Sequence, residues 1–244
     1  MLAFLKQLFK IQSKLPALRI FHATHLRTNL PEILRSGVID SYQGLVSRYG
    51  FDGALPYLHD RNRYDLHHTL NDSVNIALGR IPVSYLFRLS EKNWRNVWVA
   101  IELDPTLLEW QSYSIAPFGA AAKNAQLLPV NAGGNHAALL QSCFQKTVAL
   151  IERPATEKHF DEELPFPGDV PTHPNCELLL PAPIGREHWK RIVVVNAEVR
   201  KTVRLIVEAS PFPKLPVDID EAVFRIHPAT LHSNKNNKYR GNDE

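Results

Sequence analysis

Short apolar segments alternate with longer polar stretches along this chain of 244 residues. Strands are predicted where the apolar residues are β-branched or alternate with polar ones. The predicted strands lie at 18–22, 72–78, 98–103, 176–180, 191–197 and 203–209. The segment WVAIEL, 98–103, is expected to be buried on both faces. Residues 111–135 are rich in small residues and are predicted to be loop. The pattern as a whole indicates an α+β domain.

The clearest helix is predicted directly after the first strand. Asn29 is placed to cap it, and Glu32 follows three residues later, as in a capping box. Gly37 is expected to end this helix in the left-handed conformation. Other short helices or turns are expected at 84–89, after Asp104–Pro105, and at about 136–147.

The two ends of the chain differ from its middle. In MLAFLKQLFKIQSKLP the leucines fall near one side of a helix and the lysines near another. We expect an amphipathic helix over 1–17 that docks on the domain, with membrane-surface binding as the less favoured alternative and no membrane span. The polar end, LHSNKNNKYRGNDE, is predicted to be disordered. The main domain is therefore placed at 18–210, followed by an extension over 211–244.

Composition and charge change this picture little. Apolar residues make up 44% of the chain and charged residues 22%, and the net charge is +3, which by itself does not indicate a nucleic-acid-binding protein. Basic residues cluster at 186–204, where a solvated edge is favoured over a phosphate-binding patch. Cys143 and Cys176 have no metal-ligand spacing, and two cysteines in a chain of this length fit a reducing, cytoplasmic location.

The strand at 176–180 carries the first candidate for chemistry. It follows a proline-rich loop over 154–176, and a loop of that length in a compact domain is usually functional. Glu177 stands at the mouth of the strand, where a carboxylate can act as a general acid or base. Asn175, two residues earlier, is expected on the same face. The alternative is a strand-edge charge paired with a nearby cation.

A second polar cluster ends the first strand. His22 and Thr24 share a strand face, and His25 begins the following turn. No third ligand at a convincing spacing accompanies the two histidines, so no metal site is expected. The cluster is either structural or the wall of a binding site, and Asn29 serves equally as a helix cap or as a ligand contact.

Arginines accompany the predicted strand 72–78. Ser73 opens that strand, and arginines flank it at 61, 63, 80 and 88. Arginines near a carboxylate suit recognition of phosphate or pyrophosphate. The chain has no glycine-rich phosphate loop, no strand–glycine–helix dinucleotide motif and no serine–histidine–aspartate signature. A dinucleotide would therefore bind through another fold.

The order of these motifs resembles that of a known family. FHATHLRTNLPEILRSGVI comes first, followed by DSVNIAL with SYLFR, VWVAIELDPTLL, a small-residue segment ending in KNA, and THPNCELLLPAPI. In this order they resemble the DarT family of DNA ADP-ribosyltransferase toxins, in its more divergent branch, over about residues 20–207. Two departures stand out. The family usually has Gln where this chain has Asn175. The family's catalytic arginine corresponds best to Arg88 and second best to Arg80.

The resemblance implies a split, strongly bent sheet that binds NAD+ as a substrate. It also implies transfer of ADP-ribose to thymidine or guanosine in single-stranded DNA, and a macrodomain antitoxin of the DarG type as partner. Glu177 and Arg88 would be catalytic. The NAD+ pocket would be lined by His22, Thr24, His25, Asn29, Ser73 and Arg80. The DNA would contact Phe160, Phe166, His173 and Asn175. The alternatives are transfer to RNA or protein, and a non-catalytic binding module of the same fold.

Overall fold

The computed structural model describes residues 18–57, 71–83, 86, 97–117, 127–132, 140, 143–144, 171 and 176–225. Within them an eight-stranded sheet has the strand order β10–β9–β4–β1–β3–β7–β5–β6. Its strands are β1 (Ile20–His25), β3 (Ser73–Leu78), β4 (Trp98–Leu103), β5 (Tyr113–Ala116), β6 (Leu128–Val130), β7 (Glu177–Pro181), β9 (Trp189–Val194) and β10 (Val217–Ile219). A second sheet pairs β2 (Val38–Ile39) with β8 (Ile184–Gly185).

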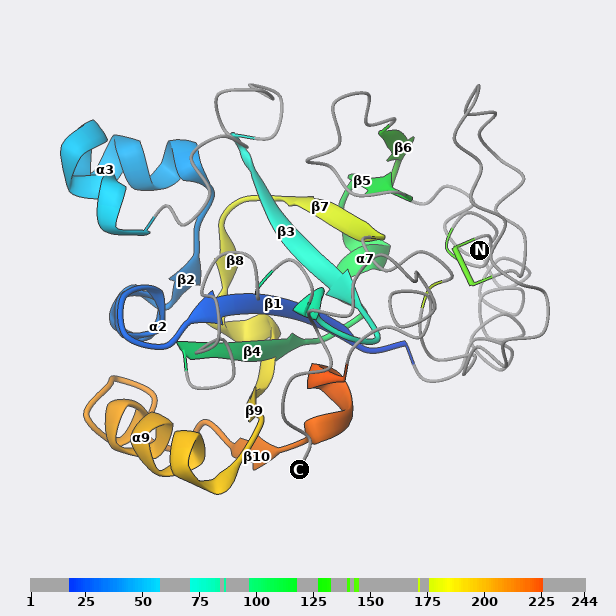
Figure 1. Cartoon of the computed structure of the whole chain (residues 1–244). Helices are drawn as coiled ribbons and strands as arrows, with labels where there is room; N and C mark the ends of the chain where they lie inside the picture. Colours follow the sequence, from blue (N-terminus) through cyan, green and yellow to red (C-terminus); the bar gives the residue numbers. More distant parts are fainter. Residues whose placement is uncertain are drawn as a thin grey trace, which may run out of the picture.

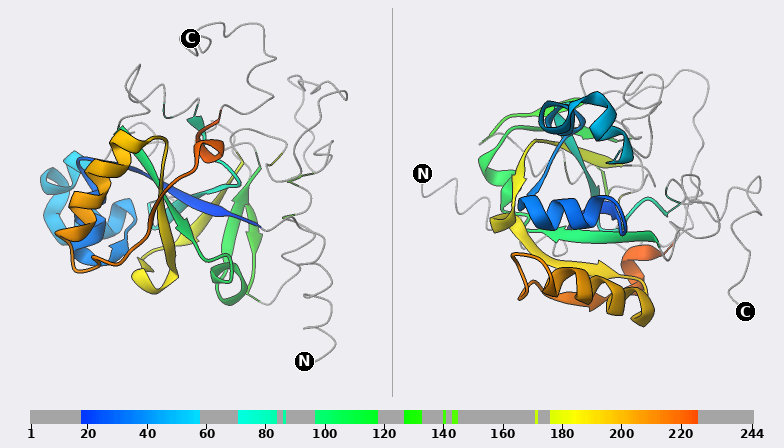
Figure 2. Two further views of the ribbon diagram at one scale, coloured as in Figure 1. Left: turned by 90° about the horizontal axis from the view of Figure 1, so that it is seen from below. Right: turned by 90° about the vertical axis from the view of Figure 1, so that its left-hand side faces the viewer.

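Helices lie mainly at one side of the large sheet. The described α-helices are α2 (Asn29–Ser36), α3 (Tyr42–Ala54), α7 (Leu107–Trp110) and α9 (Ala197–Glu208). Short 3-10 turns are η1 (Leu55–Tyr57), η4 (Arg186–His188) and η5 (Glu221–Phe224). Figure 1 and the left panel of Figure 2 show α2, α3 and α9 gathered away from β5 and β6, which end the sheet on one side. This combination of sheet and helices confirms the predicted α+β class.

The strands predicted at 72–78, 98–103, 176–180 and 191–197 are confirmed as β3, β4, β7 and β9, with small shifts at their ends. Every residue of β4 is buried, as the apolar segment predicts. Strand β1 extends three residues beyond the predicted end, so His25 closes the strand instead of beginning the turn. Gly37 ends α2 with φ of 74°, as expected.

The prediction of a strand at 203–209 is wrong, because these residues belong to α9. The helix is capped by Asn196, whose side-chain oxygen accepts a hydrogen bond of 2.9 Å from the backbone N–H of Val199. Val199, Val203 and Val207 are buried at every fourth position, which is the spacing of one helix face. The β-branched composition favours a strand, but the capping residue and the four-residue period prevail.

Two further differences concern the segments around the sheet. The predicted loop at 111–135 contains the short strands β5 and β6, which pair with each other and extend the sheet beyond β7. Past residue 210 the chain continues into the same fold. There β10 pairs in parallel with β9, and Val223 and Phe224 of η5 are buried in the common core.

A buried carboxylate joins the strands of the β10–β9–β4–β1 half. Glu102 on β4 accepts two hydrogen bonds from Arg19, at 3.0 and 2.9 Å, and one of 2.7 Å from Arg191 on β9. Arg19 also reaches Asp220 at 2.8 Å, and Arg191 reaches Asp218 at 3.0 Å. Burial acts to raise the pKa of Glu102, but the two arginines outweigh it and lower the pKa below its usual value. Arg191 of the basic segment 186–204 is therefore engaged within the fold.

We predict that Glu102→Gln lowers the free energy of unfolding by about 2–3 kcal/mol, because it leaves two half-buried guanidinium groups without their shared carboxylate. Urea unfolding followed by circular dichroism measures this. Glu208→Gln, on the exposed end of α9, is the control and should change the value by less than about 0.5 kcal/mol. Equal effects of the two substitutions would contradict the central role of Glu102.

Candidate active site

The large sheet is split between its two central strands. Strand β1 pairs with β4 along its whole length, from Ile20 to His25. With β3, in contrast, it pairs at two positions, Ile20 with Leu78 and Phe21 with Ala77. Beyond these pairs the two strands separate, and Figure 1 shows them converging at one end and splaying toward α2 and α3. We call this divergence the split; it begins at His22 and Asn75.

His22 is the first residue of β1 inside the split. Its Nδ1 lies 3.1 Å from the backbone carbonyl oxygen of Asn75, across the gap. A carbonyl oxygen can accept but not donate, so Nδ1 carries the proton and Nε2 is the ring's acceptor. Desolvation by burial lowers the pKa of His22 to about 4, against the smaller opposing effect of this hydrogen bond. The ring is therefore neutral at pH 7.

Glu177 lies on the other side of β3. It pairs with Ala77 on β3 and with Ala116 on β5, which places it near the closed end of the split. The side-chain amide of Asn75 donates to Oε2 of Glu177 at 2.5 Å. Asn75 thus contacts both His22 and Glu177, which are 155 positions apart in the sequence. The predicted site residues His22 and Glu177 are brought together, and Asn75, which sequence reasoning missed, connects them.

Thr24 and Cys176 lie next to this connection. Thr24 is 1% exposed, and its hydroxyl has no hydrogen-bond partner within the described part of the chain. It shares the β1 face of His22, as predicted. Cys176, directly before Glu177, is buried against Cys143; their hydrogen bond, followed by desolvation, raises its pKa. Such a thiol stays protonated at neutral pH and is not expected to act as a nucleophile.

His25 and Asn29 join the end of β1 to the start of α2. The Thr28 hydroxyl donates to the side-chain oxygen of Asn29 at 2.7 Å, so it accepts from Nδ1 of His25, 3.0 Å away. The Asn29 amide donates to the backbone oxygen of Tyr57 at 3.0 Å. The predicted cap at Asn29 is wrong, because the helix begins at Asn29 itself, after Thr28. Its side chain instead holds η1 against the open end of the split.

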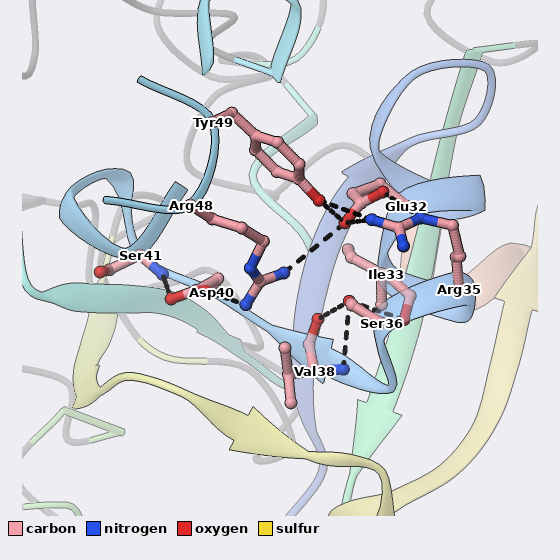
Figure 3. A network of polar contacts seen from close by, with 9 residues as sticks. All are labelled: Glu32, Ile33, Arg35, Ser36, Val38, Asp40, Ser41, Arg48 and Tyr49. Atoms are coloured by element: carbon pink, nitrogen blue, oxygen red, sulfur yellow. Dashed lines mark hydrogen bonds and ion pairs between the residues drawn. The ribbon is translucent and has the colours of Figure 1, made fainter. Parts of the chain in front are cut away.

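A charged network fixes α3 beside α2, as Figure 3 shows. Glu32 on α2 accepts from Arg35 at 2.9 Å and from the hydroxyl of Tyr49 on α3. Arg48, also on α3, lies 3.5 Å from Glu32 and 2.6 Å from Asp40. Burial acts to raise the pKa of Glu32, but the hydrogen bonds from Arg35 and Tyr49 outweigh it and lower the pKa. Glu32 is therefore a link between helices, not part of a capping box.

Of the other predicted site residues, the structure describes Ser73 and Arg80. Ser73 lies opposite Pro181, four residues along β3 from Ala77, which corresponds to about 13 Å from Glu177 along the strand. Arg80 follows β3 after Gly79, whose φ is 67° and whose N–H donates to the Arg19 carbonyl at 2.8 Å. Arg80 thus follows the end of β3 where the split is closed. The predicted residues outside the described part of the chain are Arg88, Phe160, Phe166, His173 and Asn175.

Metal-binding clusters and membrane-spanning helices are both absent from the described residues. Within the described ranges, no three histidine, cysteine, aspartate or glutamate side chains are grouped so that they could hold a metal ion. No helix in the same residues is long and apolar enough to cross a membrane. The predicted N-terminal helix, 1–17, lies outside the described residues.

Comparison with known proteins gives a fold. No protein-family model matches the chain, and no curated protein matches it. Among solved structures it is similar to Thermus sp. 2.9 DarT, in complexes with NAD+ and with ADP-ribosylated single-stranded DNA. In both cases the TM-score is 0.54 and the identity 13%, over 85% of this chain and 97% or 96% of the other. The predicted DarT-like, ADP-ribosyltransferase fold is confirmed.

A larger protein has the same fold in part. The Thermosipho africanus DarTG structure in complex with ADP-ribose matches with a TM-score of 0.55 and 14% identity. The match covers 85% of this chain and 51% of that one, so this chain corresponds to about half the length of the DarTG protein. The low identities agree with a divergent branch.

The pKa of His22 leads to a prediction about pH. An unfolded histidine titrates near 6.5 and the folded one near 4, so protonation favours the unfolded chain and stability is lost as pH falls through this window. Between pH 7 and pH 5 we expect a loss of about 2 kcal/mol that is absent in His22→Gln. Urea unfolding at the two pH values measures the difference.

The matched control is His188→Gln, since this ring lies outside the split, beside Glu187. It should keep the wild-type loss of stability between the two pH values. If His22→Gln also keeps that loss, the neutral state of the half-buried His22 ring is contradicted.

Proposed function

We propose that this protein is an ADP-ribosyltransferase that uses NAD+ and modifies a base in single-stranded DNA. The observation that carries the proposal is the connection of His22, Asn75 and Glu177 across the split of a DarT-like sheet. The Thermus DarT structures with NAD+ and with ADP-ribosylated single-stranded DNA support it.

Glu177 is the catalytic carboxylate of this proposal. The bond between the nicotinamide nitrogen and ribose C1′ breaks, and its electrons leave with nicotinamide. The ribose carbon then resembles an oxocarbenium ion, which a neighbouring carboxylate stabilises. One atom of the acceptor base then forms a new bond to C1′. The proton that this atom loses passes to Glu177.

The NAD+ pocket is proposed along the β1 wall of the split. Neutral His22 offers Nε2 as an acceptor for a hydroxyl or amide of NAD+, and the buried Thr24 hydroxyl supplies a second polar group. The other proposed contacts with NAD+ are His25, Asn29, Ser73 and Arg80. Neutral groups beside a single carboxylate suit a cationic nicotinamide ring, because a charged imidazole would repel it.

The acceptor base is proposed to meet the loop that leads into Glu177. Phe160, Phe166, His173 and Asn175 would contact the DNA, with the aromatic rings stacking on exposed bases at about 1–3 kcal/mol each. Single-stranded DNA presents its bases without the cost of flipping them from a duplex. The proposed acceptor is either thymidine or guanosine.

The biological setting is proposed from the same likeness. An enzyme that modifies cellular DNA is toxic, so we propose a toxin acting in the cytoplasm and a macrodomain antitoxin of the DarG type as its partner. The DarTG structure that matches this chain over part of its length supports that pairing.

The direct test incubates the protein with NAD+ and single-stranded oligonucleotides, each enriched in one base, and weighs the products. We expect one oligonucleotide class to gain one ADP-ribose and an equal amount of nicotinamide to be released. Glu177→Gln should slow transfer about a hundredfold or more and stay folded. Glu187→Gln, an exposed glutamate ten residues later, is the control and should keep wild-type activity.

The alternatives give other results in the same assay. Labelling of RNA or protein in preference to DNA would replace the proposed acceptor but keep the reaction. No release of nicotinamide with any acceptor, and no shift of the melting temperature with NAD+, would favour a non-catalytic module. Full activity of Glu177→Gln would move the catalytic role to another residue.

A second prediction separates the two candidate arginines. The position of Arg80 at the closed end of the split supports its role in holding the NAD+ phosphates. We expect Arg80→Ala to slow transfer at least about tenfold, and Arg80→Lys to restore little, because a lysine cannot bind phosphate bidentately. Arg88→Ala, measured beside it, should slow transfer about a hundredfold or more, because Arg88 is the proposed catalytic arginine. The reverse order would give the catalytic role to Arg80.

A further inference from the structure

Asn75 touches both halves of the candidate site. Its backbone carbonyl accepts the hydrogen bond from His22, and its side-chain amide donates to Glu177. The residue lies on β3, the strand between β1 and β7, so it spans the split on one side and the β3–β7 pairing on the other.

The strand register sets this contact. Asn75 pairs with Leu179, and Ala77 pairs with Glu177, so Asn75 and Glu177 are diagonal neighbours on one face of the sheet. Val74 and Ile76 occupy the opposite face and are buried, 2% and 0% exposed. A slip of one residue would bury Asn75 and expose two large apolar side chains, so the core holds the amide in place.

The chemistry of the amide suits a carboxylate that must stay charged. An asparagine amide donates a hydrogen bond but neither gains nor loses a proton near neutral pH, so it holds the side chain of Glu177 in place without transferring a proton. An aspartate here would repel Glu177, and a lysine would compete with the cationic substrate. Asparagine orients the carboxylate and leaves its charge intact.

We propose that Asn75 is the positioning residue of the reaction, which holds Glu177 at the ribose and the ring of His22 in one tautomer. This inference rests on the proposed transferase function. Asn75 would act on the rate of transfer through Glu177, with little effect on the affinity for NAD+.

The test compares three variants of matched size or position. Asn75→Ala removes the donor, and Asn75→Asp keeps the shape but turns a carboxylate toward Glu177. Ser114→Ala is the control. Ser114 lies on β5 and pairs with Leu179 from the other side of β7, and Ser114 and Glu177, both described, share no hydrogen bond. We expect kcat to fall at least about tenfold in Asn75→Ala and further in Asn75→Asp, with KM for NAD+ changed less than about threefold.

The pH profile separates positioning from general damage. Two carboxyl groups at hydrogen-bond distance cannot both be charged easily, so the acidic limb of the Asn75→Asp profile should move to higher pH. Ser114→Ala should keep the wild-type profile. A wild-type kcat and pH profile in Asn75→Asp would overturn the inference.

A stability cycle tests the contact without NAD+. At pH 8, Asn75→Asp should lower the urea midpoint, and adding Glu177→Gln should restore most of it, because the repulsion is removed. Additive effects of the two substitutions would overturn the contact. The two substitutions could also prove non-additive in stability while the wild-type protein transfers no ADP-ribose. That result would confirm the contact but overturn the transferase function, and the positioning role with it.

Discussion

The pairing of β1 with β3 at two positions is the constraint on which the site depends. The strands separate after Phe21 and Ala77, and across the gap the backbone carbonyl of Asn75 accepts its hydrogen bond from the ring of His22. The same separation leaves His22, Thr24 and His25 on a part of β1 that is not paired with β3. One ring nitrogen thus replaces a strand-to-strand hydrogen bond at the point where the site begins.

Charge is distributed differently around and within the split. The frame is held by ionised networks in which each buried carboxylate has two or more partners, as at Glu102 and Glu32. Inside the split the described groups that meet Glu177 and β1 are neutral, namely Asn75, His22 and Thr24. These three groups therefore add no charge of their own to the split.

The sequence predicts the strands and the two walls better than it predicts their connection. The apolar segments at 98–103 and 176–180 locate β4 and β7, and Glu177 is conspicuous at the mouth of an apolar strand. Asn75 is one polar residue in an alternating strand, and its role depends on a register with residues about a hundred positions later. The valines of α9 favour a strand by composition, which explains the wrong prediction there. Strands β5 and β6 are too short to give an alternating pattern that stands out from the small residues around them.

The central claim is that NAD+ lies in the split with its nicotinamide ribose against Glu177. A crystal structure with carba-NAD+, an analogue with which Thermus DarT has been solved, tests it most directly. The account predicts a ribose hydroxyl within hydrogen-bond distance of Glu177 and a polar atom of the ligand at Nε2 of His22. Ligand bound elsewhere on the protein, with the split unchanged and empty, would contradict it.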